Sequence, residues 1–173
     1  MNSRFTACWL FLLLCLTGGC AGYRLGAPGP GDKVGRTLRV LPVVNETLEP
    51  RLSEFVTTAL RRQIQHDGTF RLTTGDDDPA DWVLRATVIA LERHGVSFNP
   101  NDIVRPQDFE LILRTRVRVT DRTTGQVWLD RTFEGRRLMR IGPDLTSSER
   151  QALPLVAEDL ARQVVLALAE GDW

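Results

Sequence analysis

The most regular pattern of apolar and polar positions lies in residues 37–64, which read TLRVLPVVNETLEPRLSEFVTTALRRQI. Residues 38–44 form a short apolar run rich in β-branched side chains, and such a run is too short to nucleate a stable helix. It predicts a buried strand. After Pro50, apolar residues recur every three or four positions, which places them on one face of an amphipathic helix that ends near Gly68. These apolar positions are Leu52, Phe55, Val56, Ala59, Leu60 and Ile64.

Strand patterns follow this helix. Residues 69–74 contain Phe70 and Leu72 and predict a short edge strand. Residues 81–93, DWVLRATVIALER, are almost continuously apolar, which is typical of an inner strand of a sheet. Residues 94–108 contain a glycine and two prolines and predict a loop. The apolar residues of this loop are open to two interpretations, contact with a partner or lipid and packing over the sheet edge.

A pair of antiparallel strands is predicted next. Residues 109–120 alternate between apolar and basic side chains, and residues 126–137 return after the turn sequence DRTTG at 121–125. One face of the first strand carries Leu113, Thr115, Val117 and Val119, and the other face carries Arg114, Arg116 and Arg118.

The last apolar pattern, at Leu153, Val156, Ala157, Leu160, Val164 and Leu168, predicts a second helix. Thr146 and Glu149 have the spacing of a capping box, whereas Pro154 should kink the helix or divide off a separate short helix before it. The element order is therefore β-α-β-β-β-α. It predicts an α+β fold, a two-layer sandwich with two helices on one face of a mixed, mainly antiparallel four-stranded sheet.

The first residues predict export. Arg4 precedes an apolar segment at 7–16, which has the length of a secretory signal and is too short to span a membrane. Residues 16–20, LTGGC, resemble the bacterial lipoprotein signal, in which the cysteine is lipidated and becomes the first residue of the mature chain. The alternative is an ordinary signal peptide with Cys20 as a free thiol. The lipoprotein interpretation gives a signal peptide at 1–19, a lipid anchor and flexible tether at 20–36 and one domain at 37–173.

Ala21 follows the lipidated cysteine, in place of the aspartate that retains enterobacterial lipoproteins at the inner membrane. We therefore expect a protein anchored by lipid to the outer membrane, on its periplasmic side. The glycine- and proline-rich composition of residues 21–36 is typical of a flexible tether.

Charge and chemistry narrow the function further. The chain has 22 basic and 22 acidic residues, and this balance argues against a nucleic-acid partner. After removal of residues 1–19, Cys20 is the only cysteine, and the two histidines, His66 and His94, have no catalytic or metal-binding motif around them. The three aspartates at 76–78 could form a cation site, but a solvated turn is favoured because they lack the ligand spacing of a known cation-binding motif. We expect a non-enzymatic protein without metal or cofactor; a periplasmic hydrolase would have to depend on one of the histidines.

Several segments together resemble the lipopolysaccharide-assembly lipoprotein family LptE. They are Cys20 followed closely by Gly22-Tyr23, the motif P-x-x-N-x-T at 42–47 before a helix, Ala80-Asp81 before the next strand, and the D-x-x-T-G hairpin at 121–125. Ala21 departs from the family, which commonly has Gly-Tyr directly after the cysteine. The resemblance implies a plug and assembly subunit inside an LptD-like outer-membrane β-barrel translocon, which helps to insert lipopolysaccharide into the outer leaflet.

Direct binding of the lipid A part of lipopolysaccharide would require exposed arginines near an apolar patch. The candidates are Arg114, Arg116, Arg118, Arg136 and Arg137. For the first three, the alternative is ion pairing with acids of the neighbouring strand, such as Asp130 and Glu134. The alternative function is an envelope adaptor lipoprotein, either an activator of a cell-wall synthase or a subunit of an oligomeric secretion pore.

Overall fold

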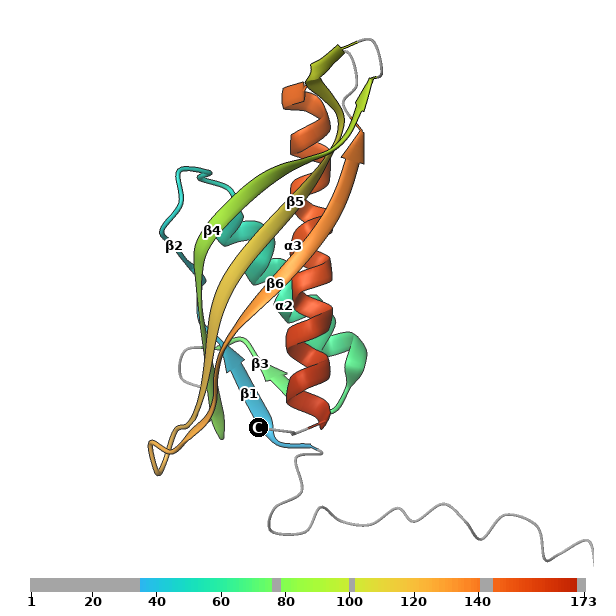
Figure 1. Cartoon of the computed structure of the whole chain (residues 1–173). Helices are drawn as coiled ribbons and strands as arrows, with labels where there is room; N and C mark the ends of the chain where they lie inside the picture. The colour runs from blue at the N-terminus through green and yellow to red at the C-terminus, as the bar shows by residue number, and fades with distance from the viewer. Residues whose placement is uncertain (1–34, 76–78, 100–101, 141–144, 171–173) are drawn as a thin grey trace, which may run out of the picture. The chain divides into compact units, whose positions relative to one another are not determined.

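The computed structural model describes residues 35–75, 79–99, 102–140 and 145–170, all within the compact unit Lys33–Trp173. Figure 1 shows its elements. In chain order they are β1 (Thr37–Val40), β2 (Val44–Asn45), α2 (Leu52–Asp67), β3 (Arg71–Thr73), β4 (Trp82–Asn99), β5 (Asp102–Asp121), β6 (Val127–Arg140) and α3 (Leu145–Glu170). The predicted signal peptide, Cys20 and the aspartates at 76–78 lie outside the described residues.

The strands form one mixed sheet in the order β3-β1-β4-β5-β6, and β2 also pairs with β4. β1 is parallel to both of its neighbours, whereas β4, β5 and β6 form an antiparallel meander. The prediction of a mixed α+β sheet is confirmed. The prediction of four strands is wrong, because the described sheet has six, in the chain order β-β-α-β-β-β-β-α.

The first predicted strand is divided in two at residues 41–43. Pro42 has no amide hydrogen to donate, and the Val43 amide donates to the Thr57 hydroxyl of α2 at 3.1 Å. Pairing with β4 resumes at Val44, which lies opposite Thr87. β1 and β2 are therefore two parts of one line of chain, joined through a contact with the helix that follows them.

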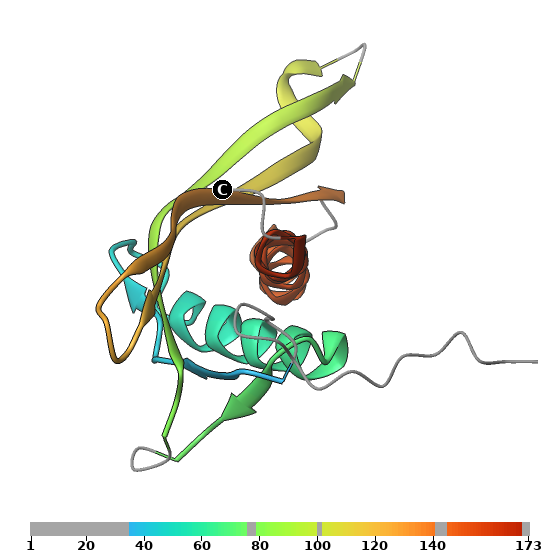
Figure 2. The same cartoon turned by 90° about the horizontal axis from the view of Figure 1, so that it is seen from below.

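Both helices cover the same face of the sheet, as Figure 2 shows from below. α2 begins and ends close to its predicted bounds, and its C-terminal stop is Gly68, whose φ of 75° is the left-handed conformation that glycine adopts most easily. The core between the layers is almost entirely apolar. Its largest fully buried side chains are Trp82, Leu38, Leu52, Leu60, Ile64, Leu84, Leu111, Leu113, Leu153, Leu160, Leu168 and Val40.

The loop predicted at 94–108 is wrong. β4 continues to Asn99 and β5 begins at Asp102, so the two strands form one long hairpin. Register shifts occur in this region, between Gly95 and Ser97 and again up to Asn99. Glycine and proline lowered the strand signal in the sequence, but an irregular hairpin accommodates both because its bulges leave some amides unpaired.

α3 is one continuous helix with Pro154 inside it, so the prediction of a separate first helix is wrong. The buried residues on both sides of the proline, Leu153 and Val156, hold the helix against the sheet. The helix begins at Leu145, one residue before the predicted capping residue Thr146. Glu149 pairs with Arg93 of β4 through its Oε1 atom and the arginine Nε atom at 2.8 Å.

α3 packs very closely on β6 at Gly135. A β-carbon at this position would lie 2.4 Å from the Val156 carbonyl oxygen and 2.9 Å from the Leu160 amide nitrogen, so only glycine fits. One residue later, the Arg136 amide donates to the Asp159 carboxylate of α3 at 2.9 Å. The helix thus supplies an acceptor for a backbone donor of the edge strand, which would otherwise be open to pairing with another chain.

Candidate binding surface

The sheet face opposite the helices carries a network of ion pairs, which we call the ion-paired face. It arises from the alternation of β5: Leu113, Thr115, Val117 and Val119 are buried beneath the helices, and the arginines between them point to the other side. The predicted alternation is confirmed. The ion-paired face comprises Glu92, Glu110, Arg114, Arg116, Arg118, Asp130, Glu134 and Arg136.

Arg114 lies between two carboxylates from the neighbouring strands. Its Nε atom donates to Glu134 on β6 at 2.8 Å, and Nη1 donates to Glu92 on β4. Arg136 binds the second oxygen of Glu134 at 2.8 Å and approaches Glu110 at 3.5 Å. Hydrogen bonds from Arg114 and then from Arg136 hold the pKa of Glu134 below its usual value.

Asp130 is shared by two arginines. Arg116 binds it through both oxygens, at 2.9 and 3.0 Å, and Arg118 donates two hydrogen bonds to Oδ2, at 3.0 and 2.6 Å. The hydrogen bonds from Arg116 and Arg118 lower the pKa of Asp130 to about 2. The alternative of pairing with acids on the neighbouring strand is therefore confirmed for the three arginines of β5. Their binding of lipopolysaccharide stays a prediction.

The five candidate arginines do not lie on one surface. Arg136 joins the three arginines of β5, but Arg137 lies on the other face of β6, where α3 is. There it borders a shallow hollow of about 210 Å³ together with residues of α3 such as Ser148 and Gln151. Consecutive residues of a strand point to opposite faces of the sheet, so the sequence alone predicts that Arg136 and Arg137 are separated in this way.

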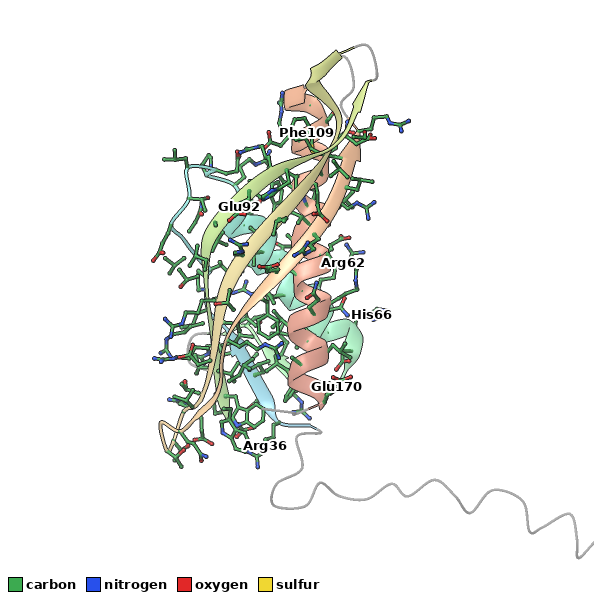
Figure 3. All side chains as sticks on the ribbon, viewed as in Figure 1. Arg36, Arg62, His66, Glu92, Phe109 and Glu170 are labelled. Carbon is green, nitrogen blue, oxygen red and sulfur yellow. The ribbon has the colours of Figure 1, made fainter. Side chains whose placement is uncertain are left out.

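The two histidines occupy unrelated places. Arg62 and His66 of α2 lie where the two helices meet (Figure 3) and border a hollow of about 300 Å³, across which Arg62 pairs with Glu158 at 3.3 Å. His94 of β4 contacts Glu92 at 3.1 Å. Among the described residues, no group of three or more histidine, cysteine, aspartate and glutamate side chains is placed to hold a metal ion.

A second surface was missed by the sequence analysis. Residues 45–49 form a turn fixed by side chains: Asn45 donates to the Glu49 carbonyl at 2.7 Å and accepts from the Thr47 amide at 3.0 Å. The turn displays Leu48, which is fully exposed, beside a hollow of about 400 Å³ that Ile89 of β4 also lines. The motif P-x-x-N-x-T contains Asn45 and Thr47, whose side chains fix the turn, so this motif was the sequence signal for it.

None of the described helices combines the length and apolar character that crossing a membrane requires. No curated protein sequence matches the chain. Solved structures match it at low identity. Hypothetical protein CT253 from Chlamydia trachomatis is 13% identical, with a TM-score of 0.57 over 79% of this chain and 96% of that one. A putative lipoprotein from Caulobacter crescentus CB15 is 16% identical, with a TM-score of 0.52 over 76% and 88%.

The PelC dodecamer from Paraburkholderia phytofirmans is 17% identical, with a TM-score of 0.51 over 83% of this chain and 93% of that one. At such identities these likenesses concern the fold. The family model described as LptE, lipopolysaccharide-assembly, matches residues 35–168, which include every described helix and strand apart from the last residues of α3. The chain belongs to the LptE family of lipopolysaccharide-assembly proteins.

Proposed function

We propose that this protein is a non-enzymatic outer-membrane lipoprotein that forms the plug and assembly subunit of a β-barrel lipopolysaccharide translocon. The observation that carries the proposal is the LptE family match over residues 35–168. The ion-paired face supports it, because a domain enclosed by a barrel lumen lined with polar groups needs a polar surface whose charges are balanced. In this role the protein helps the barrel, an LptD-like subunit, to insert lipopolysaccharide into the outer leaflet.

The test is co-purification of the full-length protein, tagged at its C-terminus, from crosslinked native envelopes. We expect a barrel of outer-membrane size to be recovered in about equal amount with the tagged chain. Recovery of a cell-wall synthase, or of the tagged chain alone, contradicts the proposal. A tagged outer-membrane lipoprotein of another family is the control for unspecific capture.

Anchorage by lipid on Cys20 is part of the proposal. Mass spectrometry of the mature chain should find residue 20 as its first residue, carrying acyl chains. Several acyl chains give stable anchorage, because each buried methylene contributes about 0.8 kcal/mol, whereas a single chain is marginal. Cys20→Ser should release the protein into the periplasmic fraction. A bare cysteine, or an unchanged membrane fraction for the variant, removes the anchor from the proposal.

Direct contact with lipopolysaccharide is proposed at the ion-paired face. Carboxylates hold the guanidinium groups of Arg114, Arg116 and Arg118 in a line, and an anionic ligand exchanges with them at small cost because solvent already screens these exposed pairs. Charge reversal of these three arginines should abolish capture of lipopolysaccharide, whereas reversal of Arg62 between the helices should not. Arg137→Glu tests the opposite face by itself. Unchanged capture by the triple variant removes this contact and leaves the plug role standing.

The second candidate function is a subunit of an oligomeric secretion pore. It is favoured by the fold that this chain shares with PelC, whose structure is a dodecamer. Native mass spectrometry of the purified lipoprotein separates the two functions. A ring of many copies supports the pore subunit, and a complex of one copy with one barrel supports the plug.

A further inference from the structure

We infer that the turn at residues 45–49, which we call the Leu48 turn, is a docking element for a protein partner that offers an apolar socket with a basic rim. The inference deepens the proposed function, on which it rests for the identity of that partner as the barrel. It concerns a surface distinct from the ion-paired face.

The Leu48 turn is held in one conformation by its own side chains. Asn45 bonds both the Glu49 carbonyl and the Thr47 amide, at 2.7 and 3.0 Å. The Thr47 hydroxyl donates to Asn45 Oδ1 at 2.8 Å and accepts from the Glu49 amide at 3.3 Å. The Glu46 amide donates to the Val88 carbonyl at 3.0 Å, which fixes the turn to β4. A turn ordered in this way loses little conformational entropy when a partner binds.

This rigid turn places a leucine entirely in water. A single exposed leucine is ordinary on a protein surface, but this one has apolar neighbours. Val44 on β2 is 58% exposed and Ile89 on β4 is 41% exposed. Ile89 is the extra residue of a bulge between Val88 and Ala90, and its side chain lies on the outward side of β4, like that of Thr87. Leu48 and Ile89 line a hollow of about 400 Å³, and Val44 lies opposite Thr87, two residues before Ile89 on β4. We call these three side chains the apolar patch.

The hollow lies between the turn and the edge of β4 beyond its last pair with β2. The residues Ile89, Ala90, Leu91 and Arg93 line it from β4, and Glu46, Thr47, Leu48 and Glu49 line it from the turn. Pairing of β2 with β4 ends at Asn45 and Val88, and no other described strand pairs with β4 on that side above this point. In Figure 1 the chain after β2 swings out beside β4 before it enters α2. The partner can therefore reach the apolar patch from the open edge.

Charge identifies the kind of partner. Glu46 and Glu49 flank Leu48, and their carboxylates form no ion pair within the described part of the chain. Arg93, the basic residue of the hollow, is already paired with Glu149. Two unpaired acids beside an apolar patch repel an anionic lipid surface and attract arginine and lysine. The occupant that fits is a protein socket with apolar walls and basic residues at its rim.

The test places a photo-crosslinking amino acid at position 48 of the full-length lipoprotein in native envelopes, with position 166 as the control. Leu166 of α3 is 57% exposed and lies outside the patch. We expect position 48 to crosslink to the barrel, at a peptide that mass spectrometry finds to contain apolar residues beside arginine or lysine. Crosslinking to a second copy of the chain, to lipid, to a site without basic residues or to nothing overturns the inference.

Affinity gives the second measurement. Leu48→Gln should weaken binding of the barrel by roughly tenfold to a hundredfold, as expected for loss of one buried leucine, while Leu166→Gln leaves it unchanged. Glu46→Lys combined with Glu49→Lys should weaken it as well, and more so at low salt. Equal recovery of the barrel with wild type and Leu48→Gln refutes the inference and leaves the proposed function intact. If the wild-type protein recovers no barrel, the proposed function fails. The inference about the Leu48 turn then stands only if position 48 crosslinks to another protein, at a site with apolar residues beside arginine or lysine.

Discussion

β6 and α3 approach each other very closely at Gly135, and Gly135→Ala is the sharpest test of that packing. The added β-carbon would lie 2.4 Å from the Val156 carbonyl oxygen and 2.8 Å from the Leu160 β-carbon. Separations below 3.0 Å are essentially never found for real β-carbons, so α3 must retreat by at least 0.6 Å. The Val156 carbonyl oxygen belongs to the helix backbone and the Leu160 β-carbon is bonded directly to it, so neither atom can rotate away as the end of a flexible side chain can.

The magnitude follows from the surroundings of the contact. Val156 and Leu160 are fully buried, so a retreat of α3 loosens the core along the helix. Overpacking of this kind costs about 1–3 kcal/mol, which corresponds to a fall of roughly 3–9 °C in the melting temperature for a chain of this size. An alanine in an unconstrained strand would act in the opposite direction, because glycine weakens strands by about 0.5–1 kcal/mol relative to alanine.

The assay is thermal and urea unfolding of Gly135→Ala beside wild type. Thr132→Ala, an exposed position of the same strand, is the matched control and should stay within about 0.5 kcal/mol of wild type. A variant at residue 135 as stable as wild type, or more stable, would refute the close contact between β6 and α3. A fall in stability of the same size in the control would show that the loss at residue 135 is not specific to the contact with α3, since alanine by itself favours a strand over glycine.

Three further outcomes are expected. The two arginine partners of Asp130 lower its pKa to about 2, from an ordinary value of 3.8. This carboxylate therefore stabilises the fold above pH 4 and loses that effect as the pH falls toward 2. The melting temperature of Asp130→Asn should fall less steeply than that of wild type over this interval. Asp159→Ala removes the acceptor of the Arg136 amide, so it should lower the free energy of unfolding by about 1 kcal/mol and speed hydrogen exchange at that amide. Asp159→Asn keeps an acceptor oxygen, and the Arg136 amide of this variant should exchange at the wild-type rate. Thr115 is fully buried and its hydroxyl has no hydrogen-bond partner among the described residues, so Thr115→Val should raise stability by about 1 kcal/mol in urea unfolding; a loss would reveal a partner for the hydroxyl.

The regular parts of the fold could be predicted because each follows from a local rule. The spacing of Leu52, Val56 and Ile64 determines a helix, and Gly68 ends it for a steric reason that applies in any protein. The alternation of residues 113–119 determined which side chains of β5 are buried. The divided first strand was missed because the amide of Val43 finds its acceptor on the Thr57 side chain of α2, a tertiary contact that the pattern of apolar residues does not reveal.

The charged residues show a similar limit. Alternation placed Arg114, Arg116 and Arg118 on one face, and the short turn at 121–125 brought acids of β6 opposite them, so their pairing was open to prediction. The pairing of Arg114 with Glu92 could not be predicted, because a bulge after Val88 shifts the register of β4 and brings Glu92 within reach of Arg114. Ile89, the extra residue of that bulge, stays on the outward side of β4 and lines the hollow beside Leu48.

The parallel pairing of β1 has a consequence for the order in which the protein folds. Leu38 lies opposite Trp82 in the sheet, and the Thr37 amide donates to the Asp81 carboxylate, a partner 44 residues away in the chain. The meander of β4, β5 and β6 needs only hairpin closures between neighbouring strands, which are fast because their contacts are local. β1 must therefore wait for the middle of the chain, and it joins a sheet that later segments are able to start without it.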